Sequence, residues 1–181
     1  YLLHSYQYLN ITSRKLRMLP SELVLPAKDI PPNIFHLKDA LAGAASKLKV
    51  TIERKFEVER FHTAPRQNVD GDDQKPLYFI ANKTFIEAIS ETNFRWYASE
   101  ECKDIEVVDP NGVFAITIDP LDGFSSIDIN APVGTIFSVF PAVDDPDKSF
   151  LRPASQQIAA GNFISGPQTI LMLTHGSGVC E

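Results

Sequence analysis

Four acidic residues stand directly after two stretches that have the composition of β-strands. The stretches are residues 95–98 and 113–118, and the acidic residues that follow them are Glu100, Glu101, Asp119 and Asp122. Neighbouring strands end at a common edge of a sheet, so these carboxylates are expected to converge there. Oxygen ligands without histidine or cysteine favour Mg²⁺, with Mn²⁺ as an alternative, over Zn²⁺. We therefore predict a divalent-metal site at this edge.

Each acidic pair taken alone has an ordinary structural interpretation. Glu-Glu is common on solvated surfaces, and Asp-Pro and Asp-Gly are frequent turn pairs. The two glutamates are neighbours, so a shared site requires the chain to turn at Glu100. Asp119 and Asp122 are three residues apart across Pro120, which favours a turn that brings them to one side. The joint pattern, rather than either pair, indicates the metal site.

The segment after these acids has the composition of a phosphate-binding turn. Gly123 precedes Phe124, Ser125 and Ser126, which are expected to begin a helical turn. The free N–H groups and the positive end of such a turn attract an anion, and a glycine lets phosphate approach closely. A plain helix start capped by Ser125 or Ser126 is the competing interpretation. A metal site beside a phosphate site predicts hydrolysis of a phosphate monoester.

Two helices and a set of strands are expected to position these groups. Apolar spacing predicts amphipathic helices over residues 34–56 and 77–88. β-branched and aromatic runs predict strands over residues 95–98, 113–118, 134–140 and 169–174. Three further segments are predicted as a polar loop, a short helix and a break, respectively residues 65–73, 155–160 and 161–167. This order predicts an α/β (α+β) domain in layers, preceded by an irregular arm over residues 1–32.

The composition is that of a globular protein and excludes several partners. The chain has 181 residues, of which 44% are hydrophobic and 22% charged, and this suits one domain. Its net charge is −6 and it has no run of basic residues, so neither nucleic acid nor an acidic membrane is an expected partner. The two cysteines lack metal-ligand spacing, and no apolar run is long enough to cross a bilayer. The expected location is the cytoplasm.

The central motif resembles that of a known family. Residues 115–141, AITIDPLDGFSSIDINAPVGTIFSVFP, are similar to the signature of fructose-1,6-bisphosphatases, DPLDGSSNID followed by a VGTIFSI-like strand. GDDQKPL, YASEE and FLRPASQQIAAGNFISGPQTILML also occur in family order. The resemblance covers residues 33 to 179. It implies the N-terminal half of the layered αβαβα sugar-phosphatase fold, with a metal- and phosphate-binding domain over residues 33–181 and the C-terminal domain absent from this sequence.

The resemblance also implies roles for individual residues. The implied Mg²⁺ ligands are Glu100, Glu101, Asp119, Asp122 and the backbone carbonyl of Leu121. The implied phosphate-binding residues are Asp122, Gly123, Phe124 and Ser125. The implied catalytic residues are Asp72 and Glu101, and Asp72 belongs to the loop that engages the metal site. The implied reaction, part of gluconeogenesis, converts the sugar bisphosphate fructose 1,6-bisphosphate to fructose 6-phosphate and phosphate. Members of the family are homo-oligomers, commonly tetramers.

Three positions depart from the family pattern and bear on activity. Tyr78 stands where the family has an aspartate implicated in catalysis, and a phenol with a pKa of about 10 does not accept a proton near neutral pH. Phe124 and Ser126 replace the usual serine and asparagine of the phosphate turn. Because the groups that hold the rest of the substrate are expected in the C-terminal half, little or no activity is predicted for this chain alone.

Two alternatives to this enzyme remain open. A non-catalytic relative with an interaction or regulatory role would keep the fold and tolerate Tyr78. An inositol-phosphatase-like enzyme would share the double acid and the DP(I/L)DG turn. Val113 and Phe114 replace the Lys-Tyr pair of AMP-inhibited members, so control by AMP at the usual site is not expected.

Overall fold

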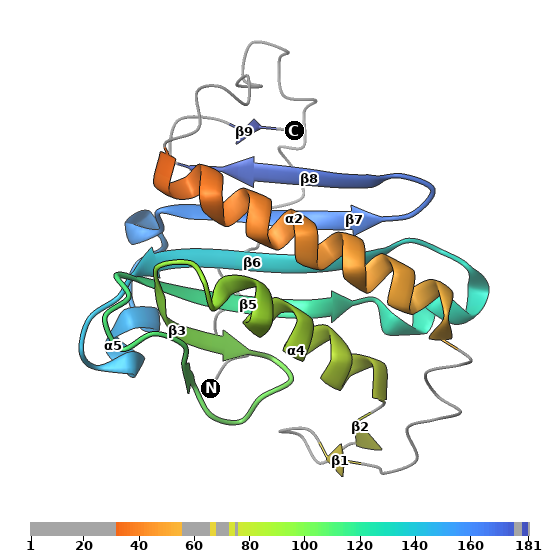
Figure 1. Cartoon of the computed structure of the whole chain (residues 1–181), viewed down its shortest axis with the longest axis horizontal. Helices are drawn as coiled ribbons and strands as arrows, with labels where there is room; N and C mark the ends of the chain where they lie inside the picture. The colour runs from red at the N-terminus through yellow and green to blue at the C-terminus, as the bar shows by residue number, and fades with distance from the viewer. Residues whose placement is uncertain (1–31, 56–65, 68–72, 75, 176–178, 181) are drawn as a thin grey trace.

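The computed structural model of the chain describes residues 32–55, 66–67, 73–74, 76–175 and 179–180. Within these ranges a mixed sheet carries two helices on one face (Figure 1). The arm predicted over residues 1–32 lies outside the described residues except for Pro32, which begins a helix. Most of the predicted polar loop also lies outside them. The predicted mixed α/β class is confirmed.

Among the described residues, seven strands form the main sheet in the order β4-β3-β5-β6-β7-β8-β9. Their bounds are β3 (Phe94–Ser99), β4 (Glu106–Val107), β5 (Phe114–Asp122), β6 (Val133–Pro141), β7 (Ala159–Ser165), β8 (Thr169–Thr174) and β9 (Val179–Cys180). Strands β3 and β5 run parallel, and the other neighbouring pairs are antiparallel. A separate two-residue ladder pairs β1 (Arg66–Gln67) with β2 (Asp73–Gln74). The four strands predicted from the sequence are confirmed.

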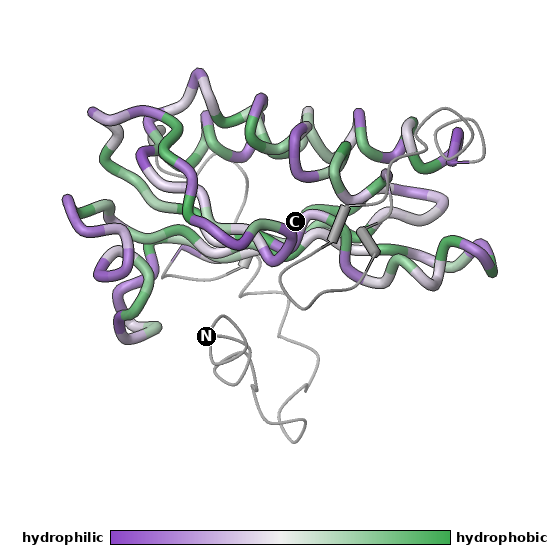
Figure 2. Tube along the Cα trace, turned by 90° about the horizontal axis from the view of Figure 1, so that it is seen from below, coloured by the Kyte–Doolittle hydropathy of each residue, from purple (hydrophilic) through white to green (hydrophobic). Residues whose placement is uncertain are grey.

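Two helices, α2 (Pro32–Glu53) and α4 (Pro76–Ile89), form one layer over the sheet (Figure 2). Each buries a stripe of apolar side chains at helical spacing. The stripes consist of Ile34, Leu37, Leu41, Ala44 and Leu48 on α2, and Leu77, Ala81, Phe85 and Ile89 on α4. Both predicted helices are confirmed. None of the described helices is long and apolar enough to span a bilayer.

The prediction of a break over residues 161–167 is wrong, because β7 occupies most of that segment. This strand pairs with β6 on one side and with β8 on the other. Gly161 suggested a break, but it meets a packing requirement: a Cβ there would lie 2.5 Å from the carbonyl oxygen of Met172 and 2.8 Å from the ring of Phe137. Pairing on both sides overrides the low strand propensity of glycine. The predicted short helix over residues 155–160 is reduced to the 3-10 turn η4 (Ala154–Gln156).

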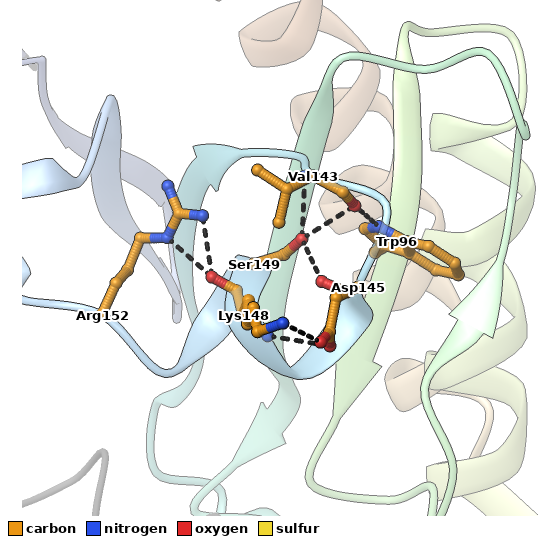
Figure 3. Close-up of polar contacts among 6 residues, drawn as sticks. All are labelled: Trp96, Val143, Asp145, Lys148, Ser149 and Arg152. Atoms are coloured by element: carbon orange, nitrogen blue, oxygen red, sulfur yellow. Dashed lines mark hydrogen bonds and ion pairs between the residues drawn. The ribbon is translucent and has the colours of Figure 1, made fainter.

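A polar corner fixes the end of the sheet where β5 begins. There the helix α5 (Pro146–Phe150) follows β6 (Figure 3). The hydroxyl of Ser149 is fully buried, lies 3.1 Å from the carbonyl oxygen of Asp145, and accepts a 3.0 Å hydrogen bond from the amide of Val143. The indole N–H of Trp96 donates to the Val143 carbonyl at 2.8 Å. Trp96 therefore packs at the end of the sheet that lies away from Asp119 and Asp122.

Candidate active site

The parallel pairing of β3 and β5 brings the two acidic segments together. In this ladder Ser99 lies beside Ile118, so both strands end at the same edge of the sheet. The amide of Glu100 donates a 3.2 Å hydrogen bond to the carbonyl of Ile118, immediately before Asp119. This adjacency supports the prediction that the carboxylates lie at one edge of the sheet.

The chain turns directly after β3, as a shared site requires. Ser99 is buried and organises the turn: its hydroxyl accepts from the amide of Glu101 at 3.2 Å, and its carbonyl accepts from the amide of Cys102 at 3.2 Å. Glu100 is exposed and Glu101 half-buried. The two glutamates thus lie in the turn that follows the β3–β5 ladder.

A register shift at the end of β5 places Asp119 and Asp122. Their partners on β6 are Ile136 and Gly134, so two residues of β5, Pro120 and Leu121, bulge between the paired positions. The Asp119 carboxylate accepts a 3.0 Å hydrogen bond from the amide of Leu121. The hydroxyl of Thr135 donates to the carbonyl of Pro120 at 2.9 Å. Asp119 is buried and Asp122 exposed, so the bulge carries one carboxylate inside the edge and one outside it.

The carboxylates interact strongly enough to shift the pKa of one of them, Asp119. The pKa of Asp119 is raised to about 7, mainly by burial and then by the charge of Glu100 and a side-chain hydrogen bond with it. The amide of Leu121 opposes this rise, and Asp122 adds a smaller electrostatic contribution. Glu100 and Asp119 therefore form a close pair, in which one carboxylate favours its protonated state when no cation is near.

Tyr78, on the first turn of α4, lies among the same acids. Burial raises the pKa of its phenol to about 12, and Glu101, Asp119, Glu100 and Asp122 contribute in decreasing order. All four predicted acids thus act on one hydroxyl. Because the phenol keeps its proton at neutral pH, Tyr78 can donate a hydrogen bond here but cannot serve as a base.

The donor set fits a hard divalent cation in chemistry, although the side chains are not gathered around one point. Among the residues that the structure describes, no three side chains of aspartate, glutamate, histidine or cysteine come close enough together to hold a metal ion. The close pair, Glu100 with Asp119, supplies oxygen donors and a mutual repulsion that a divalent cation would relieve. Asp72, the predicted loop acid, lies outside the described residues.

The predicted phosphate turn follows Asp122. Gly123 has φ of 79°, a left-handed conformation that favours glycine, and the 3-10 helix η3 (Phe124–Ile129) begins after it. The amide of Ser126 donates to the carbonyl of Gly123 at 2.8 Å. No serine side chain caps η3, so the competing interpretation of a capped helix start is not supported. Ser125 is exposed, whereas Phe124 is buried with the core.

Sequence reasoning missed the contact between the two unusual residues of this region. The rings of Tyr78 and Phe124 stack with centroids 4.8 Å apart and planes inclined by 29°. The ammonium of Lys55 lies 4.9 Å from the centroid of the Phe124 ring and forms an ion pair with Asp128. The sequence around Lys55 gave no indication of these contacts, because its partners Phe124 and Asp128 are distant in the sequence.

A buried polar network supports the turn that carries the glutamates. The hydroxyl of Tyr97 donates to the Asn82 side-chain carbonyl at 2.8 Å, and the Asn82 amide group donates to the sulfur of Cys102 at 3.0 Å. Asn82 is 7% exposed, and burial next to Glu106 raises the pKa of Cys102 to about 11. A polar residue within the apolar stripe of α4 was the sequence signal for this network.

We expect Asn82→Leu to lower the free energy of unfolding by about 1–3 kcal/mol, because it leaves the buried Tyr97 hydroxyl without its acceptor. Urea denaturation measures the change. Lys83→Leu, at the adjacent exposed position, is the matched control and should change stability by less than about 0.5 kcal/mol. Equal losses in the two variants would contradict the role given to Asn82.

Comparison with known proteins identifies the family. The family described as "Fructose-1-6-bisphosphatase, N-terminal domain" matches residues 27–181. A curated relative, the fructose-1,6-bisphosphatase class 1 of Paracoccus denitrificans, is 44% identical over 150 residues, which are 83% of this chain and 44% of the relative. The corresponding protein of Rhizobium meliloti is 47% identical over 155 residues, with 83% of this chain and 44% of the relative covered.

A solved structure agrees with these relatives. The holo form of Leishmania major fructose-1,6-bisphosphatase matches with a TM-score of 0.73 and 25% identity, over 84% of this chain and 51% of that one. This chain spans about half the length of the proteins it matches. The layered fold implied by the sequence resemblance is confirmed for this part. The chain therefore belongs to the fructose-1,6-bisphosphatase family, whose N-terminal domain it matches.

Proposed function

We propose that this chain provides the metal- and phosphate-binding part of an enzyme that hydrolyses the 1-phosphate of fructose 1,6-bisphosphate. The products would be fructose 6-phosphate and phosphate, in carbohydrate metabolism and gluconeogenesis. One observation carries the proposal: the close pair of Glu100 and Asp119 at the ends of two parallel strands, next to the turn at Gly123. The names of the relatives, all fructose-1,6-bisphosphatase class 1, support the choice of substrate.

The residues proposed to hold Mg²⁺, or Mn²⁺ in its place, lie on the two strand ends. They are Glu100, Glu101, Asp119, Asp122 and the backbone carbonyl of Leu121. The bulge in β5 supports this set, because it frees Leu121 from regular pairing between Asp119 and Asp122. When bound, a divalent cation supplies polarisation of a phosphoryl oxygen and a more acidic water. Glu101 and Asp72 are proposed to orient the attacking water and accept its proton.

The proposed phosphate-binding residues continue from the same strand. Asp122, Gly123, Phe124 and Ser125 form the turn, and the left-handed backbone of Gly123 directs the chain into η3. Their contribution would come from backbone N–H groups, because the side chain of Phe124 is buried in the core. We further propose that the protein acts as a homo-oligomer, which light scattering of the purified chain would test.

A second candidate function is supported by the residue at position 78. Tyr78 lies within the electrostatic reach of all four acids, with a phenol that does not accept a proton at neutral pH. A non-catalytic relative that binds metal and serves an interaction or regulatory role would tolerate this residue. Such a protein would keep its response to Mg²⁺ and release no phosphate.

Phosphate release from fructose 1,6-bisphosphate, with and without Mg²⁺, tests the proposed function. We expect slow release that requires Mg²⁺ and falls by at least about tenfold in Asp122→Ala. Asp147→Ala removes an exposed acid from α5, at the other end of β5, and is expected to leave the rate unchanged. Binding of Mg²⁺ without phosphate release would favour the non-catalytic relative. Release that is independent of Mg²⁺ would contradict both functions.

A further inference from the structure

Two of the residues that depart from the family signature at the proposed site, Tyr78 and Phe124, are in direct contact. Tyr78 comes from the first turn of α4, and Phe124 from the turn that follows Asp122. Their rings stack at 4.8 Å between centroids. Neither residue is explained by the proposed reaction, since a phenol that keeps its proton and a buried phenyl ring offer no acid, base or ligand.

Lys55 also contacts the Phe124 ring, and the three side chains Lys55, Phe124 and Tyr78 form a series of contacts that we call the column. The ammonium of Lys55 lies 4.9 Å from the centre of the Phe124 ring, a cation–π distance, while the Tyr78 ring is also stacked on Phe124. The side chain of Lys55 is only 6% exposed, so this contact is largely shielded from water. Its ion pair with Asp128 ties the same lysine to η3. The column therefore joins the segment after α2, the start of α4 and the turn at Gly123.

The turn is held by strand pairing of Asp122 and by buried side chains, and no side-chain cap contributes. No side chain caps η3, and the turn at Gly123 adopts a left-handed conformation in which an L side chain would be strained. Ser125 and Asp122, on either side of Phe124, are exposed. Phe124 is 5% exposed and Leu121 2% exposed, and both belong to the main core cluster, so these two side chains anchor the turn.

We propose that the column of Lys55, Phe124 and Tyr78 is the positioning element of the metal and phosphate turn, residues 121–125. In this chain the turn is held by packing of a ring between two helical segments rather than by side-chain capping. That the turn binds metal and phosphate rests on the proposed function. That the three side chains anchor the turn rests on their contacts alone. None of the three side chains is assigned a chemical step.

Amide hydrogen exchange of the full chain without metal tests the anchoring. We expect Phe124→Leu and Tyr78→Leu to speed exchange of the amides of residues 121–125 by at least about tenfold, while β7 amides keep their protection. Tyr78→Phe keeps the stacked ring and should leave exchange at the turn unchanged. Phe150→Leu is the matched control, because it removes a ring from the Phe140–Phe150 pair beside α5. Unchanged exchange at the turn in Phe124→Leu would overturn the proposal.

Mg²⁺ titration, followed by thermal unfolding, connects the anchor to the site. We expect Phe124→Leu and Tyr78→Leu each to raise the half-saturating Mg²⁺ concentration by about tenfold, and the double variant to be no worse than either. Tyr78→Phe and Phe150→Leu should stay within about twofold of the wild type. Additive losses would contradict a single column. Absence of any Mg²⁺ response in the wild type would reject the proposed metal site, and the exchange measurement would still decide the anchoring.

Discussion

Asp119→Asn is expected to stabilise the metal-free chain at pH 8 and to abolish its response to Mg²⁺. Burial makes the charged form of Asp119 unfavourable, and Glu100 repels it. An uncharged amide at this position removes both unfavourable contributions. The amide oxygen can still accept the hydrogen bond from Leu121, so the bulge in β5 keeps its support. Activity that depends on Mg²⁺ should fall by more than about 100-fold, since changes outside the ligand shell alone cost about 10- to 100-fold.

Thermal unfolding of the wild type and of Asp119→Asn, with and without Mg²⁺, measures both the gain in stability and the loss of the Mg²⁺ response. Wild type should unfold at a higher temperature with Mg²⁺, and Asp119→Asn should unfold at the same, raised temperature in both buffers. Asp147→Asn, in which an exposed acid of α5 is replaced, serves as the control and should keep the Mg²⁺ shift. A variant that is less stable than wild type in metal-free buffer would show that Asp119 supports the fold instead of straining it.

Local sequence signals were sufficient for the two long helices, for four of the strands and for the acidic edge. The helices and the predicted strands depend on apolar spacing within each segment, and the carboxylates follow two of those strands directly. The carboxylates come together because β3 and β5 are parallel neighbours and end at the same edge of the sheet. These inferences involve short separations or a simple rule of sheet geometry, and they agree with the structure.

Contacts between distant segments could not be predicted in the same way. Lys55 and Asp128 are 73 positions apart, and neither has a neighbour that indicates an ion pair. Tyr78 and Phe124 were each identified as unusual, yet their stacking depends on how α4 lies over the end of β5. Residue type showed where the chain departs from its family, and only the packing showed that the departures are coupled.

This coupling changes how activity should be restored. Tyr78→Asp alone adds a fifth carboxylate beside four others and removes the ring that packs on Phe124. A failure of this variant to gain turnover would therefore not distinguish a damaged enzyme from a non-catalytic relative. The double variant Tyr78→Asp with Phe124→Ser restores both family residues, and its turnover compared with each single variant separates the two functions.

Strand β7 gives the largest expected effect on stability, at the segment where the sequence prediction was wrong. Phe163→Ala is expected to cost about 3–5 kcal/mol, because the ring is 2% exposed and packs 5.9 Å from that of Phe137. That is a large share of the roughly 5–15 kcal/mol that stabilises a typical domain. Ile164→Ala changes the next residue, which points to the other face of the sheet and is 38% exposed.

The comparison of these neighbours in urea denaturation decides between a strand and a break. In a strand, successive side chains lie on opposite faces, so Ile164→Ala should cost less than about 1.5 kcal/mol while Phe163→Ala approaches the cost of a full core residue. In an irregular break over residues 161–167, the two positions would have no reason to differ in this direction. Similar losses at Phe163 and Ile164 would therefore contradict the pairing of β7 with β6 and β8, and with it the close packing of Gly161 against Phe137 and Met172.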